Sequence, residues 1–188
     1  MPTLPEVNEY VNAYVWRKVP KVLISIRALI STDWKGVRKI YLEGIATRQA
    51  TFETEAPLWE EWDAKHLPFA RLVAESEDGS LLGWAALSAV SSRRVYAGVA
   101  EVSVYVAENS RKRGIGKVLL QRLIEESEAH GIWTLQASIF PENVASVGTH
   151  GSCGFRVVGT RARIAKLDGK WRDTLIMERR SSLSEFQT

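Results

Sequence analysis

A basic loop with two glycines is the feature of the sequence that most directly predicts chemistry. Residues 111–117 read Arg-Lys-Arg-Gly-Ile-Gly-Lys, between an alternating strand pattern at 101–106 and a helical pattern that begins at Ile115. The N-terminus of a helix presents unpaired N–H groups and the positive end of the helix dipole, which together hold phosphate. Glycine lets the main chain approach the anion closely. We therefore expect this loop to bind a phosphate group.

Two common phosphate-binding motifs do not fit the loop. The pattern G-x-x-x-x-G-K-[ST] fails because no glycine precedes Gly116 at that spacing and Val118 stands at the Ser/Thr position. The dinucleotide pattern G-x-G-x-x-G fails because Leu119 replaces its third glycine. What remains is Arg111-x-x-Gly114-x-Gly116. The alternative to a ligand site is an ordinary basic capping loop at the start of a surface helix.

The composition indicates a soluble globular protein, with 45% hydrophobic and 25% charged residues among 188. No apolar run is long enough to cross a bilayer, and residues 1–14 lack the regions of a signal peptide. Cys153 is the single cysteine, which excludes an intrachain disulfide and, with three scattered histidines, a Cys/His zinc site. The net charge of +3 is mild, without aromatic residues interleaved among the arginines. We expect a cytoplasmic protein with no metal and no nucleic-acid or membrane partner.

The hydrophobic patterns predict a mixed α/β sheet, because a strand–helix–strand unit implies a parallel pair and hairpins flank it. We expect an N-terminal extension at 1–20, one domain at 21–180 and a C-terminal tail at 181–188. Strands are expected at 21–29, 70–75, 81–90, 96–106, 134–140, 155–166 and 170–179, and helices at 34–46, 58–66, 114–131 and 143–152. The apolar face of the third helix is expected at Ile115, Val118, Leu119, Leu123 and Ile124.

Four segments together resemble the GNAT N-acetyltransferases. They are residues 40–55, residues 96–106, the Arg111 loop, and Asn143-x-x-Ser146-x-x-x-His150-x-x-x-Gly154-Phe155 followed by Gly169-Lys170-Trp171-Arg172-Asp173. Within that superfamily the sequence resembles the phosphinothricin N-acetyltransferase-like group. That group acetylates the α-amino group of glutamate-like herbicides and of analogues such as methionine sulfoximine and methionine sulfone.

The resemblance implies the GNAT fold, a mixed sheet of about seven strands splayed open near its centre, with helices on both faces. Acetyl-CoA lies in the splay, where its pantetheine pairs with strand 101–106 as an added strand and its pyrophosphate meets the loop. For Asn143, a contact to coenzyme A and a helix N-cap fit the sequence equally. The cofactor-binding residues implied are Val104, Tyr105, Val106, Arg111, Lys112, Arg113, Gly114, Ile115, Gly116, Lys117, Asn143 and Ser146.

The resemblance assigns catalytic roles to Glu101 and His150. Because an α-amine is mostly protonated at pH 7, a base must take a proton before the amine attacks the thioester, and Glu101 matches the family's catalytic glutamate. His150 matches a family histidine that protonates the departing thiolate or shares the base role. The alternatives are a solvated strand-end charge for Glu101 and a structural histidine for His150. Thr149 replaces the family's leucine, and Gly148 and Gly151 weaken the helix there.

The resemblance also implies a small-molecule amine as acceptor, an α-amino acid or analogue, acetylated by direct transfer in a ternary complex of a homodimeric enzyme. Two other functions stay open: acetylation of another amine, such as an aminoglycoside, a polyamine or a protein N-terminus, and non-catalytic sensing of acetyl-CoA. Ordinary packing or a solvated charge is the alternative for each residue that the resemblance assigns to the acceptor, namely Thr51, Phe52, Glu53, Arg93, Tyr96, Ser103 and Trp171.

Overall fold

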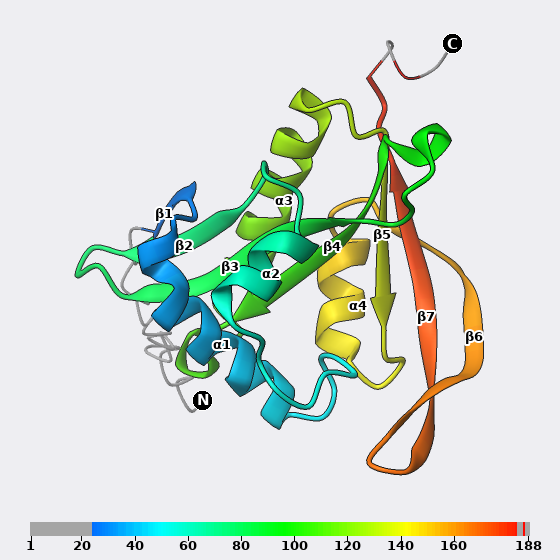
Figure 1. Cartoon of the computed structure of the whole chain (residues 1–188), viewed down its shortest axis with the longest axis horizontal. Coiled ribbons are helices and arrows are strands. Elements are labelled where there is room, and N and C mark those ends of the chain that lie inside the picture. Colours follow the sequence, from blue (N-terminus) through cyan, green and yellow to red (C-terminus); the bar gives the residue numbers. More distant parts are fainter. Residues whose placement is uncertain (1–23, 184–185, 187–188) are drawn as a thin grey trace, which may run out of the picture.

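Seven strands form one mixed sheet in the order β1-β2-β3-β4-β5-β7-β6 (Figure 1). The computed structural model describes residues 24–183 and residue 186. The strands are β1 (Ile24–Ala28), β2 (Leu72–Ser76), β3 (Leu81–Ala89), β4 (Val99–Val106), β5 (Thr134–Ile139), β6 (Arg156–Leu167) and β7 (Lys170–Arg180). The helices are α1 (Trp34–Ala46), α2 (Trp59–Lys65), α3 (Ile115–Ala129) and α4 (Val144–Gly151), with 3₁₀ turns at Ser31–Asp33, Arg94–Tyr96 and Glu108–Ser110.

The sheet opens between β4 and β5, which run parallel while the other neighbouring strands run antiparallel. β4 and β5 pair at three positions, of which Glu101 opposite Gln136 is the last. Beyond this pair, β4 continues beside β3 to Val106, whereas β5 continues beside β7 to Ile139. The two strands therefore diverge, as Figure 1 shows. This arrangement confirms the mixed, open sheet expected from the sequence.

Helices cover both faces of the sheet through two apolar cores. On one face, α3 packs Leu119 and Leu123 against β3 and β4. On the other face, Val37 of α1 meets Trp62 of α2 and Trp84 of β3. Burying one such side chain stabilises the fold by about 1.5–3 kcal/mol. The two cores therefore hold β3 and β4 firmly between α1 and α3.

The strand expected at 96–106 begins later, at Val99, because residues 94–96 form a 3₁₀ turn. The carbonyl of Gly98 accepts hydrogen bonds from the N–H groups of Trp133 at 2.8 Å and Thr134 at 3.1 Å. The Trp133 ring lies where a side chain at Gly98 would be. These contacts draw the main chain against the entry to β5, so that β4 can start only after Gly98.

The apolar face expected for α3 is wrong at one position. Val118 is 42% exposed, whereas Leu120, which the expected face omitted, is fully buried. The buried stripe runs one residue further round the helix than the sequence pattern indicated, so Val118 lies at its edge. The stripe consists of Ile115, Leu119, Leu120, Leu123, Ile124 and Ser127.

The two ends of the chain differ in how much the structure describes. The extension expected at 1–20, and the first residues of the strand expected at 21–29, lie outside the described residues. At the other end, Ser181 is buried and its N–H donates to the Trp133 carbonyl at 2.9 Å. The tail expected at 181–188 thus begins with an anchored residue. The helices that the structure describes include none long and apolar enough to cross a membrane.

Replacing Gly98 with alanine is expected to destabilise the fold. The added methyl group would lie 2.0 Å from the Trp133 ring, so the junction of β4 and β5 must shift, at a cost of about 1–3 kcal/mol. Urea unfolding measures the change. Gly148→Ala is the matched control, because nothing lies within 4 Å of its added methyl group and alanine favours a helix interior by about 1 kcal/mol over glycine. A Gly98→Ala protein as stable as wild type would contradict this close packing.

Candidate active site

Glu101 lies at the point where β4 and β5 part. Its main chain is level with Ser88 of β3 and Gln136 of β5, and its side chain is half-buried. Because side chains alternate along a strand, Ser103 and Tyr105 share its face of β4. Tyr105 packs into the core formed by α1 and α2. A carboxylate therefore stands at the opening of the sheet, on the face to which α1 packs.

The edge of β4 beyond Glu101 is available to a ligand. From residue 102 to residue 106 the strand pairs with β3, and none of the described strands pairs with its other edge. The side chains of Val104 and Val106 pack toward the α3 core, which leaves the main chain at that edge. Free N–H and C=O groups along a strand edge favour an extended ligand that adds as a further strand.

The loop after β4 has the geometry of an anion site. Gly114 precedes α3 in the left-handed region at φ +81°, and Lys112 lies there too at φ +61°. The Ile115 side chain is buried, so only its main chain is available to a ligand. Lys112, Arg113 and Lys117 are exposed around the first helical turn. The N–H of Lys117 donates to the Gly114 carbonyl at 3.1 Å, whereas the N–H groups of Ile115 and Gly116 have no partner within the helix.

Arg111 is placed differently from the other cations of the loop. Its guanidinium donates to the main-chain carbonyls of Val106 at 3.3 Å and Glu43 at 3.4 Å. The Glu43 carboxylate in turn accepts a hydrogen bond from the N–H of Glu108 at 2.7 Å. Arg111 and the end of α1 therefore hold the loop from the protein side.

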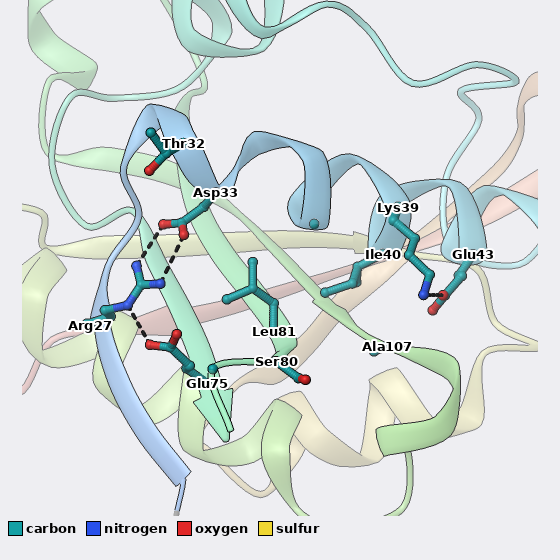
Figure 2. A pocket seen from close by; sticks show the side chains of 12 residues that line it. Arg27, Thr32, Asp33, Lys39, Ile40, Glu43, Glu75, Ser80, Leu81 and Ala107 are labelled. Atoms are coloured by element: carbon teal, nitrogen blue, oxygen red, sulfur yellow. Dashed lines mark hydrogen bonds and ion pairs between the residues drawn. The ribbon is translucent and has the colours of Figure 1, made fainter. Parts of the chain in front are cut away.

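Glu43 also lines a pocket of about 440 Å³ between α1, β1 and the β2–β3 hairpin (Figure 2). Arg27 donates to both carboxylate oxygens of Asp33, at 2.7 and 2.9 Å, and to Glu75 at 2.7 Å, while Lys39 faces Glu43. The hydrogen bonds from Arg27 hold the pKa of Asp33 below its usual value. The pocket thus sets two cations among three carboxylates, and the hydrogen bonds of Arg27 tie β1 to β2 and to the start of α1.

α4 lies beside the loop, with Thr149 next to Gly116, and Figure 1 places it between the diverging ends of β4 and β5. Asn143 is its N-cap, since its side-chain oxygen accepts from the N–H of Ser146 at 3.1 Å. The amide nitrogen of Asn143 donates to the carbonyl of Gln49 at 3.0 Å. Of the two roles that fit the sequence, the N-cap is the one the structure contains, and a contact to coenzyme A stays a prediction.

The imidazole of His150 is buried and held in one tautomer. It is 5% exposed, and burial lowers its pKa, although the hydrogen bond to the Ser146 carbonyl acts in the opposite direction. Nδ1 lies 2.8 Å from that carbonyl. Because a carbonyl only accepts, Nδ1 carries the proton and Nε2 keeps its lone pair. Phe155 meets the ring edge-on, with centroids 5.1 Å apart. Burial therefore favours the neutral form of His150, in which Nε2 carries no proton.

A groove of about 470 Å³ lies at the junction of β4 and β5, where its lining includes Gln136, the residue paired with Glu101, but not Glu101 itself. Tyr96 and Trp133 supply aromatic surface, Arg180 supplies a cation, and Gln136 lies level with Glu101 across the two strands. Residues level with one another in adjacent strands point to the same face, so the groove opens on the Glu101 face. Its mixed lining suits a small molecule with both apolar and charged groups.

Further along β4, the loop at 47–55 covers the same face. Thr51 lies beside the phenols of Tyr41 and Tyr105, and burial raises the pKa of both phenols. The Phe52 ring meets Phe140 edge-on, with centroids 4.8 Å apart. Glu101 and Ser103 thus lie between the groove on one side and Thr51 and Phe52 on the other.

Three residues expected at the acceptor site lie at its margin. Arg93 is exposed with its guanidinium over the Tyr96 ring, 5.6 Å from the centroid, and Glu53 is exposed and faces Lys65 at 3.9 Å. Trp171 is 56% exposed on β7. Since no local pattern carries the register of β5 and β7, sequence reasoning missed three residues around the opening: Gln136, Phe140 and Arg172.

Known proteins are similar to this chain in both sequence and architecture. The chain is 34% identical over 168 residues to the L-methionine sulfoximine/L-methionine sulfone acetyltransferase of Pseudomonas aeruginosa, covering 82% of this chain and 92% of that protein. It is 32% identical over 187 residues to the phosphinothricin N-acetyltransferase of Alcaligenes faecalis, covering 95% and 91%. A crystal structure of a GNAT superfamily phosphinothricin acetyltransferase from Sinorhizobium meliloti, in complex with acetyl-CoA, matches with a TM-score of 0.77 at 28% identity, over 84% of this chain and 88% of that chain. Residues 34–155 match the acetyltransferase (GNAT) family, and the chain belongs to that family.

Proposed function

We propose that the protein transfers an acetyl group from acetyl-CoA to the α-amino group of a small amino acid or analogue, of the phosphinothricin, methionine sulfoximine or methionine sulfone type. One observation carries this proposal: Glu101 stands where the unpaired edge of β4 begins, level with Gln136, which lines a groove on the same face. The activities in the names of the relatives support the same acceptor class. Acetyltransferases of this family bind acetyl-CoA.

The residues at the opening fit acetyl-CoA in two respects. The free edge of β4 at 102–106 offers the main-chain groups of Val104 and the N–H of Val106 to an amide-bearing arm, whereas those of Tyr105 are turned toward Trp84 of β3 and the Val106 carbonyl accepts from Arg111. The N–H groups and cations at 112–117 offer a site for a diphosphate. When bound, acetyl-CoA supplies an acetyl group activated as a thioester. The protein's own part is to align that group with the amine and to move protons.

Glu101 takes the role of general base in this proposal. An α-amine is protonated at pH 7 and becomes a nucleophile only after losing a proton. The Glu101 carboxylate is half-buried beside the groove in which we place the acceptor. With donor and acceptor held on either side of the same opening, the acetyl group passes directly between them in a ternary complex.

His150 serves as a proton acceptor in the proposed mechanism. Its Nδ1–H is occupied by the Ser146 carbonyl, and burial favours its neutral form. A neutral ring with a free Nε2 lone pair takes up a proton before it can give one away. Between the two roles that the sequence left open, this favours sharing the base role over protonating the thiolate.

The acceptor is placed between Tyr96 and Phe52. Tyr96 lines the groove, and Arg93, which lies over its ring, is the residue that the resemblance offers for a carboxylate or phosphinate of the acceptor. Thr51 and Ser103 offer hydroxyl groups on the same face, and Phe52 offers an apolar wall. An amino-acid analogue carries both kinds of group, which is why it suits this surface better than a polyamine.

We also propose a cytoplasmic homodimer, formed through β6. The strand is the edge of the sheet and is exposed along most of its length. A long exposed edge with apolar side chains favours pairing with a second copy. Trp171 of the neighbouring β7 would lie at the same surface. The apolar residues that the pairing would cover are Val157, Val158, Ile164 and Trp171. A single cysteine suits a reducing compartment such as the cytoplasm.

A panel of amines tests the proposed acceptor. Purified protein with acetyl-CoA is expected to release free thiol with phosphinothricin, methionine sulfoximine or methionine sulfone, and less with an aminoglycoside, spermidine or an N-terminal peptide. Preference for one of the last three would assign the alternative acceptor instead.

The control for this panel is Glu101→Gln. As the base, Glu101 contributes about 10²–10⁴-fold to turnover, so the variant should lose activity while calorimetry records unchanged acetyl-CoA affinity. No turnover by wild type with any amine, together with tight acetyl-CoA binding, would point to a sensor.

The lowered pKa of His150 predicts how stability depends on pH. The unfolded chain binds a proton at His150 more readily than the folded one, so stability is full above the ordinary histidine pKa and falls as pH drops through it. We expect His150→Asn, which keeps a donor toward Ser146, to lose less stability between pH 7.5 and 5.5. The difference is at most about 1.4 kcal/mol per pH unit, measured by urea unfolding. His66, whose pKa burial also lowers, remains in both proteins and accounts for part of the remaining slope. Parallel stability profiles would contradict the neutral His150.

Light scattering tests the dimer. The wild-type mass is expected to be twice the 21.1 kDa of one chain. Ile164→Glu should shift the mass toward the monomer, because it places a charge in the proposed contact. Leu58→Glu, at an exposed apolar residue at the start of α2, is the control and should stay dimeric. A wild-type monomer at micromolar concentration would rule the interface out.

A further inference from the structure

Arg172 of β7 makes three contacts at the opening of the sheet. Its guanidinium donates to the main-chain carbonyl of Arg48 at 3.2 Å and to the carboxylate of Glu142 at 3.1 Å. It also lies over the ring of Phe140, 4.3 Å from the centroid. The side chain is 20% exposed, so these contacts are partly shielded from water. A planar guanidinium with donors at fixed angles suits such a set of partners, whereas an ammonium group does not.

The loop that Arg172 holds belongs to the other half of the sheet. Residues 47–55 follow α1, which packs on β3 and β4, whereas Arg172, Glu142 and Phe140 lie on β7 and at the end of β5. The next carbonyl of the loop, that of Gln49, accepts from Asn143 at 3.0 Å. Two successive loop carbonyls are therefore held by side chains from across the opening.

The two faces of the sheet differ in how their halves are joined. On the α3 face, one apolar core includes residues of both halves, such as Leu87 of β3 and Met177 of β7. On the Glu101 face, the core of Val37, Trp62 and Trp84 and its remaining members come from the first half alone. Contacts of the 47–55 loop thus join the halves on that face.

We infer that Arg172 is a positioning residue for the acceptor, because it fixes Phe140 and the loop and thereby sets the place of Phe52. This inference rests on the proposed function, in which Phe52 forms the acceptor wall. The chain of contacts runs from the guanidinium to the Phe140 face at 4.3 Å, and from Phe140 edge-on to Phe52 at 4.8 Å. Arg172 touches neither partner of the reaction. The loop at 111–117 lies on the other side of α4 from β7 (Figure 1), so a substitution at Arg172 should not alter the binding of acetyl-CoA.

The first test is Arg172→Met, which keeps an apolar chain over Phe140 and removes the donors. The acceptor KM is expected to rise about ten-fold, with kcat changed less than about three-fold, and acetyl-CoA affinity by calorimetry should not change. Arg172→Lys keeps the charge and should restore part of the loss. Phe52→Ala should raise the KM too, and the double variant should be no worse than Phe52→Ala alone. Arg122→Met is the matched control, since the Arg122 guanidinium also holds two partners, the carboxylates of Glu125 and Glu126, but lies exposed on α3.

Hydrogen exchange of the peptide covering residues 47–55 provides a readout that needs no acceptor. Exchange should quicken in Arg172→Met and stay at the wild-type rate in Arg122→Met. Unchanged exchange would show that Arg172 does not hold the 47–55 loop, even if the enzyme proved active on another amine. Faster exchange with an unchanged acceptor KM would show that Arg172 holds the loop but does not position the acceptor. Failure of wild type on the amine panel would instead reject the proposed function. The exchange result would then still show whether Arg172 holds the loop.

Discussion

The short parallel pairing of β4 and β5 is the constraint on which the rest of the structure depends. Three pairs join the strands before each follows an antiparallel partner, β3 on one side and β7 on the other. A longer pairing would occupy the edge of β4, and a shorter one would leave the halves of the sheet without a common junction. Gly98 sits at the closed end, where its carbonyl accepts two N–H groups from the entry to β5. Glu101 sits at the open end. The position of the carboxylate is therefore a consequence of where pairing stops.

Strands that diverge leave main-chain and apolar groups that other elements must cover. On the α3 face the cover is a continuous apolar core that spans both halves. On the Glu101 face it consists of aromatic and hydrogen-bonded contacts made by the 47–55 loop, including those of Phe52 and Gln49. Apolar cores pack densely and change shape little, whereas a loop held at a few points can be altered by one substitution. The α3 face of the opening is thus held by a dense core, whereas the Glu101 face depends on a loop that single substitutions can displace.

Sequence reasoning succeeded where the signal is local. The bounds of α1 agree with the expected 34–46, because a helical apolar pattern defines them within one segment. The loop at 111–117 was found from its glycines and cations for the same reason. The start of β4 was placed wrongly, because the apolar alternation runs back through Tyr96 while Gly98 is fixed by Trp133 from a distant segment. Arg172 stood in a segment that carries the family resemblance, but its place at the opening, like that of Gln136, became visible only with the register of β5 and β7.

Glu101 and His150, the two side chains that we propose as proton acceptors, approach the opening from opposite faces. Glu101 shares its face of β4 with Tyr105, which packs among α1 and α2 residues, whereas His150 packs edge-on against Phe155 of the α3 core. The groove opens on the Glu101 face. An amine in that groove therefore meets the carboxylate first, and the imidazole can act on it only through the gap between the strands. His150 is also fixed by a carbonyl and kept neutral by burial, so it offers one acceptor position and no charge. This geometry supports our proposal that Glu101 is the principal base, with His150 sharing that role from the α4 side.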